Sequence, residues 1–381
     1  MGSLAAIGPL AVDMYLPSFG AIAADLNVPV SQVERTLASY LLGLALAQLV
    51  YGPLADRLGR KIPLIGGLIL FIIASLACAS STDIEHLNLW RIIQAFGGAS
   101  GMVVPRAVIR DHLETRDAAK ALSLLMLIMG VMPIVAPLLG GQIVSLGSWR
   151  TIFHIMAGVA TLQLIAVVIA MRESLNPSAV IALRPSIIAH NYLSLLRHKK
   201  FICYTLAGGF GTAGMFAYIV GSPRVFMTIY DVDPRYFGLL FGLNALSLIL
   251  ASQLSARMLN RREPGVLLRR AQTMLVAMTL IALALTLLGL ITLPLLMLCL
   301  MGFMASQGFV NPNAAALALN EQGRRLGVAS AMMGTLQMLC GAGAGMAVSA
   351  WQSDTPLPLT GMLAVCAVLS WLFGRIALRA T

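Results

Sequence analysis

The stretch GPLADRLGRK, residues 52–61, is a charged turn between two runs that are apolar enough to cross a bilayer. One run, 41–54, precedes the charges, and the other, 62–79, follows them. Four charged residues lie between positions 56 and 61, and such groups are costly in hydrocarbon. Three of the four are arginine or lysine, so the positive-inside rule places this turn in the cytoplasm. The stretch therefore predicts a membrane protein whose chain turns back at this point.

The composition is that of an integral membrane protein. Of the 381 residues, 59% are hydrophobic and 11% are charged, whereas a soluble surface needs roughly 25 to 35% charged residues. The apolar runs are continuous rather than alternating, which indicates helices and not a transmembrane β-barrel. The net charge of +11 comes mainly from arginine and lysine in alternate turns, so it follows the positive-inside rule. We therefore expect the lipid bilayer as a partner, and no nucleic acid.

Twelve apolar segments are long enough to be transmembrane helices. Every second turn between them is basic, so both termini are predicted to face the cytoplasm of a multi-pass protein. The fold class expected is all-α. The predicted spans are 2–24, 33–54, 62–80, 87–109, 119–144, 150–171, 201–222, 235–256, 266–289, 293–317, 327–350 and 358–378.

The longest polar stretch divides these spans into two six-helix, pseudo-symmetric bundles. It covers residues 173–200, a linker in which apolar residues recur at helical spacing and predict a surface helix. The bundles are predicted at 1–172 and 201–381. A degenerate copy of the charged turn at 259–261 repeats 58–60 with a shift of 201 residues, which indicates duplicated halves of the kind that transporters contain.

Asp13 is an ionisable residue in the middle of the first span. It lies twelve residues from Asp25 at the outer edge, and at ~1.5 Å per residue that is roughly 18 Å deep. An acid at this depth is a functional candidate by default, the alternative being a structural carboxylate paired with a neighbour. Pro17 lacks the amide that would bond to the Asp13 carbonyl, so it loosens the helix there. We predict that Asp13 binds and releases a proton as a cavity alternates between sides.

The pattern of glycine, aspartate, arginine, glycine and Arg-Lys in residues 52–61 resembles the signature loop of the major facilitator superfamily. An ordinary cytosolic turn, the alternative, would need neither the glycines nor the aspartate. The resemblance implies a latch in which the aspartate meets the N-terminus of the eleventh helix near 327–330. The latch residues expected are Gly52, Asp56, Arg57, Gly59 and Arg60, with Asp111, Glu114 or Asp117 as acids for the arginines.

One face of the fourth span is polar at its outer end. It carries Arg91, Gln94, Gly98, Gly101 and Pro105 at steps of three and four residues. This face resembles the fourth-helix motif of superfamily members that exchange protons, which implies that Arg91 influences the proton-binding acid. The alternative is an interfacial arginine that snorkels to the membrane surface.

The fifth span has a face of prolines and glycines that predicts a kinked packing surface. It resembles the antiporter motif of the superfamily, with Ala136 standing where glycine is usual. The alternative is a kinked helix without directional meaning. The motif residues are Gly130, Pro133, Pro137, Gly140 and Gly141.

Residues 11–17 closely resemble the first helix of the bicyclomycin-resistance and chloramphenicol-efflux subfamily of bacterial drug/proton antiporters. The likeness continues through 43–61, 208–223 and 237–244, and it is nearest to the bicyclomycin-resistance members. It implies an exporter in the bacterial inner membrane, acting on small, largely neutral compounds of the bicyclomycin, sulfonamide or phenicol type by alternating access.

A substrate cavity is expected where polar or aromatic groups interrupt the apolar spans. Few acids and many aromatic walls favour an uncharged or amphiphilic small molecule, although a lone glutamine in a span is more often a contact between helices. The cavity residues predicted are Tyr15, Tyr40, Gln48, Gln94, Tyr218, Asn244 and Gln337.

Other functional classes fit the sequence less well. The five cysteines lie in or beside spans without metal-ligand spacing, so we expect no metal and no cofactor, with protons as the coupling ion. An enzyme would need clustered catalytic side chains, and a channel would need a lining ring of ionisable groups. A proton-coupled importer of a nutrient such as a nucleoside remains the main alternative, against which the proline-glycine face argues. We expect a functional monomer.

Overall fold

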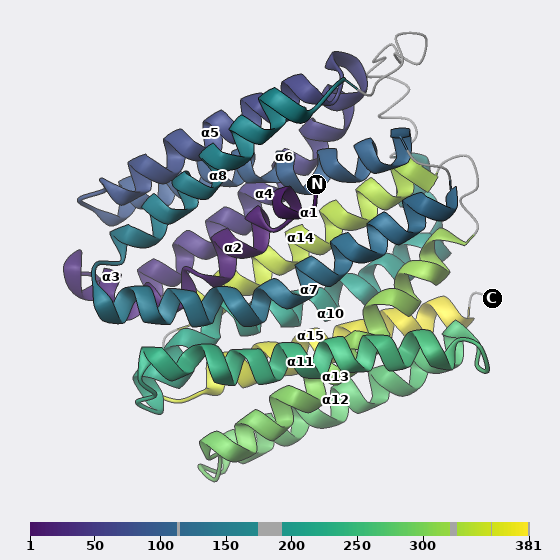
Figure 1. Cartoon of the computed structure of the whole chain (residues 1–381). Coiled ribbons are helices and arrows are strands. Elements are labelled where there is room, and N and C mark those ends of the chain that lie inside the picture. Colours follow the sequence, from purple (N-terminus) through teal and green to yellow (C-terminus); the bar gives the residue numbers. More distant parts are fainter. Residues whose placement is uncertain (113–114, 174–192, 321–325, 352, 380–381) are drawn as a thin grey trace. The chain divides into compact units, whose positions relative to one another are not determined.

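The computed structural model describes residues 1–112, 115–173, 193–320, 326–351 and 353–379. All regular elements in that part of the chain are helices, and twelve spans are long and apolar enough to cross a membrane (Figure 1). The prediction of an all-α protein with twelve membrane spans is confirmed.

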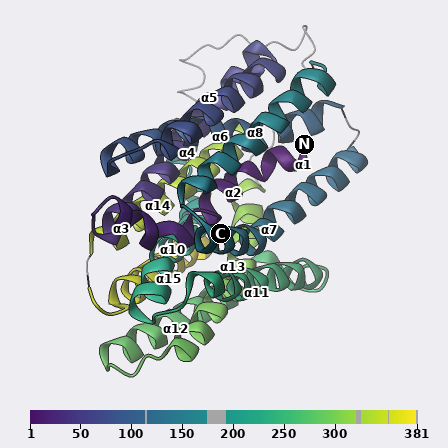
Figure 2. The same cartoon turned by 60° about the vertical axis from the view of Figure 1, so that its left-hand side comes forward.

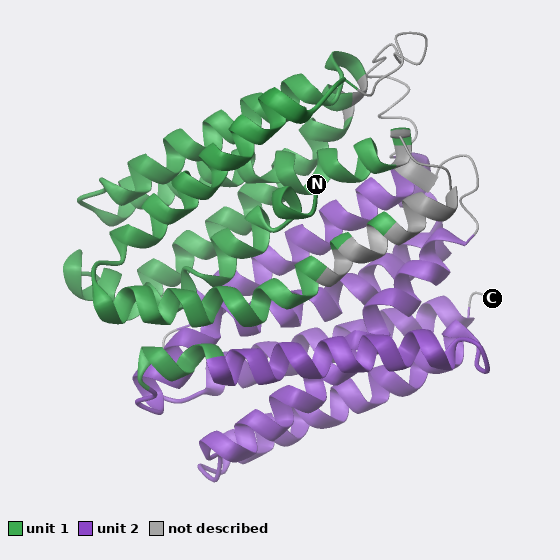
Figure 3. Ribbon diagram, viewed as in Figure 1, with its two compact units in different colours: residues 1–184, 233–238 green, residues 185–232, 239–381 purple. Residues whose placement is uncertain are grey.

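The chain divides into two compact units, which Figure 3 shows in different colours. Unit 1 comprises residues 1–184 and 233–238, and unit 2 comprises residues 185–232 and 239–381. Most of the linker predicted at 173–200 lies outside the described residues, and so does most of its surface helix.

Unit 1 contains the first six spans. The first is divided into short pieces, and the other five are long helices. In Figures 1 and 2, α5 and α8 run side by side at the edge of this unit, and their packing is direct. The elements are α1 (Gly2–Ala5), α2 (Ile7–Asp13), the 3₁₀ turn η1 (Leu16–Ser18), α3 (Phe19–Asp25), α4 (Val30–Leu58), α5 (Lys61–Ala79), α6 (Ile84–His112), α7 (Thr115–Leu146) and α8 (Arg150–Ala170).

The division of the first span follows from its prolines. Pro9 and Pro17 each lack the amide that would bond to the carbonyl four residues earlier, at Ala5 and at Asp13. The α-helix ends at both of these residues, since α1 stops at Ala5 and α2 stops at Asp13. A 3₁₀ turn with Pro17 near its start then leads into α3. The loosening predicted at Asp13 is therefore present as a break in the helix.

The charged stretch at 52–61 is mostly helical, so its prediction as an aqueous turn was wrong in extent. Helix α4 continues to Leu58, and the chain turns only at Gly59 and Arg60 before α5 begins. Gly59 has a φ of 86°, a backbone conformation that favours glycine. The helix therefore carries its charges beyond the apolar span.

Unit 2 contains the other six spans. Helix α10 packs against α13, α14 and α15, and α12 packs against α13 and α15. Both views place α12 at the edge of this unit (Figures 1 and 2). The elements are α10 (Lys199–Pro223), which continues as a π-helical turn η3 (Arg224–Ile229), then α11 (Pro234–Met258), α12 (Pro264–Leu287), α13 (Leu293–Leu319), α14 (Leu326–Ala350) and α15 (Leu357–Arg379).

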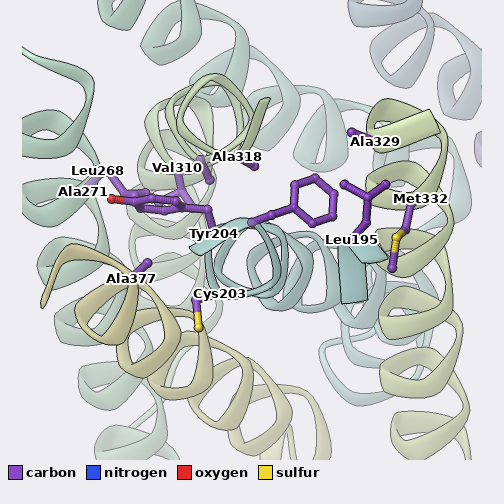
Figure 4. Close-up of a cluster of buried hydrophobic side chains, with 12 residues drawn as sticks. Leu195, Cys203, Tyr204, Leu268, Ala271, Val310, Ala318, Ala329, Met332 and Ala377 are labelled. Atoms are coloured by element: carbon purple, nitrogen blue, oxygen red, sulfur yellow. The ribbon is translucent and has the colours of Figure 1, made fainter. Parts of the chain in front are cut away.

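An apolar cluster fastens the helices of unit 2 together (Figure 4). Tyr204 and Cys203 of α10 lie in it with Leu268 of α12, Val310 of α13 and Ala377 of α15. All five are buried. Cys203 is thus a small core residue, as predicted for the cysteines.

Candidate functional site

Asp13 is a buried carboxylate at the break in the first span. Its side chain is 3% exposed, and no side chain or backbone group in the described part of the chain hydrogen-bonds or ion-pairs with it. The alternative of a structural carboxylate held by a neighbour therefore finds no partner among the described residues. An acid in such surroundings is far more costly charged than protonated, so its environment controls when it ionises.

Arg91 of α6 is fully buried at 0% exposure, so it is not an interfacial arginine that snorkels. Its Nη1 donates to Gln94 Oε1 at 2.6 Å, and its Nη2 donates to the carbonyl of Ala11 at 3.0 Å. The guanidinium lies between two aromatic rings, 4.4 Å from the centroid of Tyr15 and 4.2 Å from that of Tyr40. Cation–π contacts in a desolvated site are worth about 2 kcal/mol, which offsets part of the cost of burying the charge.

This network ties four spans to one another around Arg91. Gln94 Nε2 donates to Ser75 Oγ of α5 at 2.7 Å. The hydroxyl of Tyr15 lies 2.8 Å from Thr36 Oγ1 of α4. Arg91 holds the carbonyl of Ala11, two residues before Asp13, so it fixes the segment that carries the acid without pairing with it. Arg91 therefore positions the segment that carries Asp13.

Helix α7 packs directly on the break in the first span. Pro133 and Pro137 lie within this helix. Gly140 faces the backbone carbonyl of Met14, and a Cβ at position 140 would collide with that carbonyl. The absence of a side chain at Gly140 therefore lets α7 reach the residue that follows Asp13.

The other two glycines of the α7 motif are Gly130 and Gly141. Gly130 lies in the same helix. Gly141 lies against the carbonyl of Pro234, at the start of α11, a segment that belongs to unit 1. Through Gly140, the predicted motif face of α7 therefore packs against the break beside Asp13.

The turn after α4 is held by an acid of α6 and by an acid that directly follows α8. Arg60 Nε pairs with Asp111 Oδ2 of α6 at 2.9 Å, one of the acids expected for it. The backbone amides of Arg60 and Lys61 donate to the two carboxylate oxygens of Glu173 at 2.8 and 3.1 Å. A Cβ on Gly59 would collide with that same carboxylate. The turn is therefore anchored within unit 1.

The described residues do not test the contact that the predicted latch needs between Asp56 and the eleventh helix. Gly52 is partly exposed and Arg57 is exposed in α4. The side chains of Asp56, Glu114 and Asp117 lie outside the described part of the structure, so the contact predicted between Asp56 and the eleventh helix stays a prediction.

The predicted cavity residues fall into two groups, one in each unit. Tyr15, Tyr40 and Gln94 belong to the Arg91 network of unit 1 and are fully buried. In unit 2, Asn244 Nδ2 donates to the hydroxyl of Tyr218 at 3.1 Å, and Tyr218 stacks on Phe241. Both groups serve helix contacts. Gln48 and Gln337 are partly exposed, and Gln337 lies against Gly208 of α10.

Sequence reasoning missed three polar side chains. Glu173 lay in the predicted linker, although an acid directly after the sixth span was a signal. Glu34 of α4 is 1% exposed, and the span predicted from residue 33 placed it at the membrane edge. Gln307 of α13 is 0% exposed, and neither atom of its amide has a hydrogen-bond partner among the described residues. Its amide in the middle of a predicted span was the signal that could have identified Gln307.

The sequence matches the family model of the Major Facilitator Superfamily over residues 1–346. The chain belongs to this superfamily. It is therefore a multi-pass membrane transporter rather than an enzyme. The fold agrees, since the chain resembles the crystal structure of a D-xylose-proton symporter with a TM-score of 0.74 at 15% identity, covering 98% of this chain and 96% of that one.

Similar sequences indicate which members of the superfamily this chain resembles. The chain is 36% identical to an uncharacterized MFS-type transporter, YdgK, of Bacillus subtilis (strain 168), over 97% of this chain and 92% of that protein. It is 32% identical to a bicyclomycin resistance protein homolog of Haemophilus influenzae, with 97% and 93% covered. It is 30% identical to the multidrug resistance protein MdtL of Klebsiella pneumoniae (strain 342), with 97% and 92% covered. The resemblance to bicyclomycin-resistance relatives is thus confirmed.

Proposed function

We propose that this transporter is a proton-coupled exporter of small, largely neutral compounds in a bacterial inner membrane, with both termini in the cytoplasm. Relatives named for bicyclomycin and multidrug resistance support export of drugs. The observation that carries proton coupling is Asp13, an acid without a partner among the described residues, buried where the helix is broken.

In the proposed cycle, Asp13 takes up a proton from outside and releases it to the cytoplasm. When protonated, it is neutral and suits an apolar environment; when ionised, it needs water or a donor. Because α2 ends at Asp13, the segments on either side of it can move with little loss of helical hydrogen bonds. Each proton that moves inward supplies about 2.3 kcal/mol per 100 mV, which drives export.

Helix α7 connects this titration to the motion of the bundle. Gly140 lies on the carbonyl of Met14, so a shift of the broken segment is transmitted directly to α7. At the cytoplasmic end, Arg60 with Asp111 and Glu173 holds the turn that follows the part of α4 with Gly52, Asp56 and Arg57. We propose that Asp56 latches this turn to the eleventh helix while the cytoplasmic side is closed.

The substrate is proposed to be uncharged or amphiphilic because the buried polar side chains in the described part of unit 2 are neutral. Asn244 Nδ2 donates to the hydroxyl of Tyr218, and Asn244 Oδ1 has no hydrogen-bond partner among the described residues. A ligand that binds to this pair therefore needs a donor for that oxygen. An organic cation would need a carboxylate as its partner, and the buried polar side chains described in unit 2 include none. Drugs of the bicyclomycin, sulfonamide or phenicol type meet these conditions.

The test is drug-triggered proton movement in everted membrane vesicles. Bicyclomycin and a panel of neutral antibiotics are added to vesicles that contain wild type, Asp13→Asn or the control Asp83→Asn. Asp83 is an exposed acid outside the spans, paired with His86, so its loss leaves the buried site intact. Wild type and Asp83→Asn should release protons from the vesicle interior, and Asp13→Asn should not.

Two outcomes would overturn the proposal. An equal response from all three proteins would place coupling elsewhere. Silence from wild type across the panel, combined with proton-driven uptake of a nutrient such as a nucleoside in right-side-out vesicles, would make this chain an importer.

A further inference from the structure

A groove of about 580 Å³ lies between α12 and α15, and none of its lining residues belongs to the candidate site. Three arginines line it, Arg269 and Arg270 from α12 and Arg375 from α15. The remaining lining residues are Thr273, Met274 and Ala277. We propose that this groove binds the headgroup of an anionic phospholipid.

The two helices present these arginines at the same level. The N-terminus of α12 meets the C-terminal part of α15, since a Cβ on Gly265 would lie 3.3 Å from Leu378. Further along, Gln272 Nε2 donates to the carbonyl of Ser370 at 2.7 Å and fixes the register. Arg270 and Arg375 are each only a few residues from these two contacts, so the packing that holds the helices together also brings the charges together.

The apolar core of unit 2 forces the arginines outward. Leu268 and Ala271 of α12 are buried in the cluster of Figure 4, and so is Ala377 of α15. Arg269 and Arg270, which lie between the two buried α12 residues, are exposed. Helix α12, which carries these two arginines, lies at the edge of the unit in both overall views (Figures 1 and 2).

In the described part of the chain, the three arginines have no anionic partner. Among the described residues, no carboxylate lies within salt-bridge distance of any of the three. The Nε of Arg375 is buried and has no hydrogen-bond acceptor among the residues that the structure describes, although its guanidinium lies 5.1 Å from the Trp371 ring. Three guanidinium groups that converge without an anion repel each other, and a phosphate with its planar, bidentate recognition by arginine would relieve that repulsion.

The order of the lining residues selects a lipid over a soluble anion. Moving from Arg270 to Ala277 along α12 covers about 10 Å at ~1.5 Å per residue. Over that distance the lining changes from charged, through Thr273, to the apolar side chains Met274 and Ala277. Met274 is 45% exposed, which leaves it available to an acyl chain.

The predicted position of the groove at the cytoplasmic surface of the membrane also agrees with an anionic lipid. The basic turns predict that α12 begins and α15 ends at the cytoplasmic surface, where anionic lipids attract basic residues. The charged end of the groove is then at the depth of the headgroups, and its apolar end points into the hydrocarbon. A phospholipid has the same order of charge and apolarity.

Lipid retention measured by native mass spectrometry tests the proposal. Wild type, a variant with Arg269, Arg270 and Arg375 all changed to Gln, and a control with Arg257, Arg261 and Arg262 changed to Gln are purified from nanodiscs of phosphatidylglycerol and phosphatidylcholine. The control removes the same charge from the end of α11 and the turn before α12. We expect bound phosphatidylglycerol to fall about fivefold for each groove arginine removed, and to stay near the wild-type level in the control.

Three results would overturn the proposal. The first is equal loss in both variants, which would mean general attraction to a charged surface. The second is equal retention of phosphatidylcholine by wild type. The third is displacement of the lipid by millimolar inorganic phosphate, which would make this a site for soluble anions.

A second measurement covers the case in which the triple variant does not fold. A photoactivatable phosphatidylglycerol with its reactive group near the glycerol is crosslinked to wild type in nanodiscs. Labelled peptides should contain residues 273–277. Crosslinks confined to other helices would contradict the proposal.

Discussion

The buried polar side chains of the two units differ in chemistry. In unit 1 they include residues of charged types, Asp13, Glu34, Arg60 and Arg91. In the described part of unit 2 they are all amides or hydroxyls, among them Asn244, Gln272, Gln307, Asn313 and Ser370. Charged groups buried in a membrane protein are costly and mark function, whereas neutral ones mainly join helices. We infer that unit 1 responds to protons and that unit 2 offers hydrogen bonds to a neutral ligand.

The largest expected effect comes from removing the acid of unit 1. Asp13→Asn keeps the shape of the side chain but cannot exchange a proton, so proton-driven drug export should fall to background. Asn244→Leu in unit 2 should change the range of drugs exported and leave proton coupling to the remaining substrates intact. Drug-triggered proton release in vesicles measures both. Loss of coupling in Asn244→Leu alone would reverse the division between the units.

The second effect concerns the buried cation of unit 1. Arg91→Lys keeps a charge but cannot donate to both Gln94 and the carbonyl of Ala11. Hydrogen bonds to charged groups are worth about 1.5 to 3 kcal/mol each, so the free energy of unfolding should fall by about 3 kcal/mol. Denaturant titration of the purified protein measures it. The exposed Arg257→Lys should change it by less than about 0.5 kcal/mol.

The third comparison replaces one closely packed glycine in each unit by alanine and measures the change in the free energy of unfolding. Gly140→Ala in unit 1 meets a backbone carbonyl, and Gly211→Ala in unit 2 meets the side chain of Gln307. A backbone cannot move aside as a side chain can, so Gly140→Ala should cost about 2 kcal/mol of unfolding free energy and Gly211→Ala clearly less. Gly158→Ala, with nothing near its Cβ, is the control and should be neutral or stabilising. Equal costs at 140 and 211 would contradict this account of the packing.

The smallest effect concerns Gln307 of unit 2, whose amide has no hydrogen-bond partner in the described part of the chain. Gln307→Leu removes two buried polar atoms that have no partner among the described residues. Because an unsatisfied buried group is itself costly, the free energy of unfolding should stay the same or rise by about 1 kcal/mol. Gln272→Leu breaks the bond to Ser370 and is the matched control, which should lose about 1 kcal/mol. A clear loss in Gln307→Leu would mean that the amide is satisfied in the membrane.

Much of the fold could be predicted because membrane spans follow from local hydropathy. The twelve spans, the break at Asp13 and an acid such as Asp111 for Arg60 all depend on residues that are close in sequence or at matching helix ends. The extent of the charged turn was missed, because hydropathy cannot tell a helix that leaves the membrane from a loop. Glu173 was missed because its partners, the amides of Arg60 and Lys61, are more than a hundred residues away.

The sequence by itself determined the number of spans, their basic turns and the positions of Asp13 and the prolines, since these depend only on composition, spacing and the missing amide of proline. Only the tertiary structure decided that Arg91 is buried between Tyr15 and Tyr40, and that the predicted cavity residues separate into two groups. It also decided that Arg375 joins the arginines of α12. The reason is physical: the rotation and register of each packed helix select the partners of its side chains, and neither is written in one helix alone.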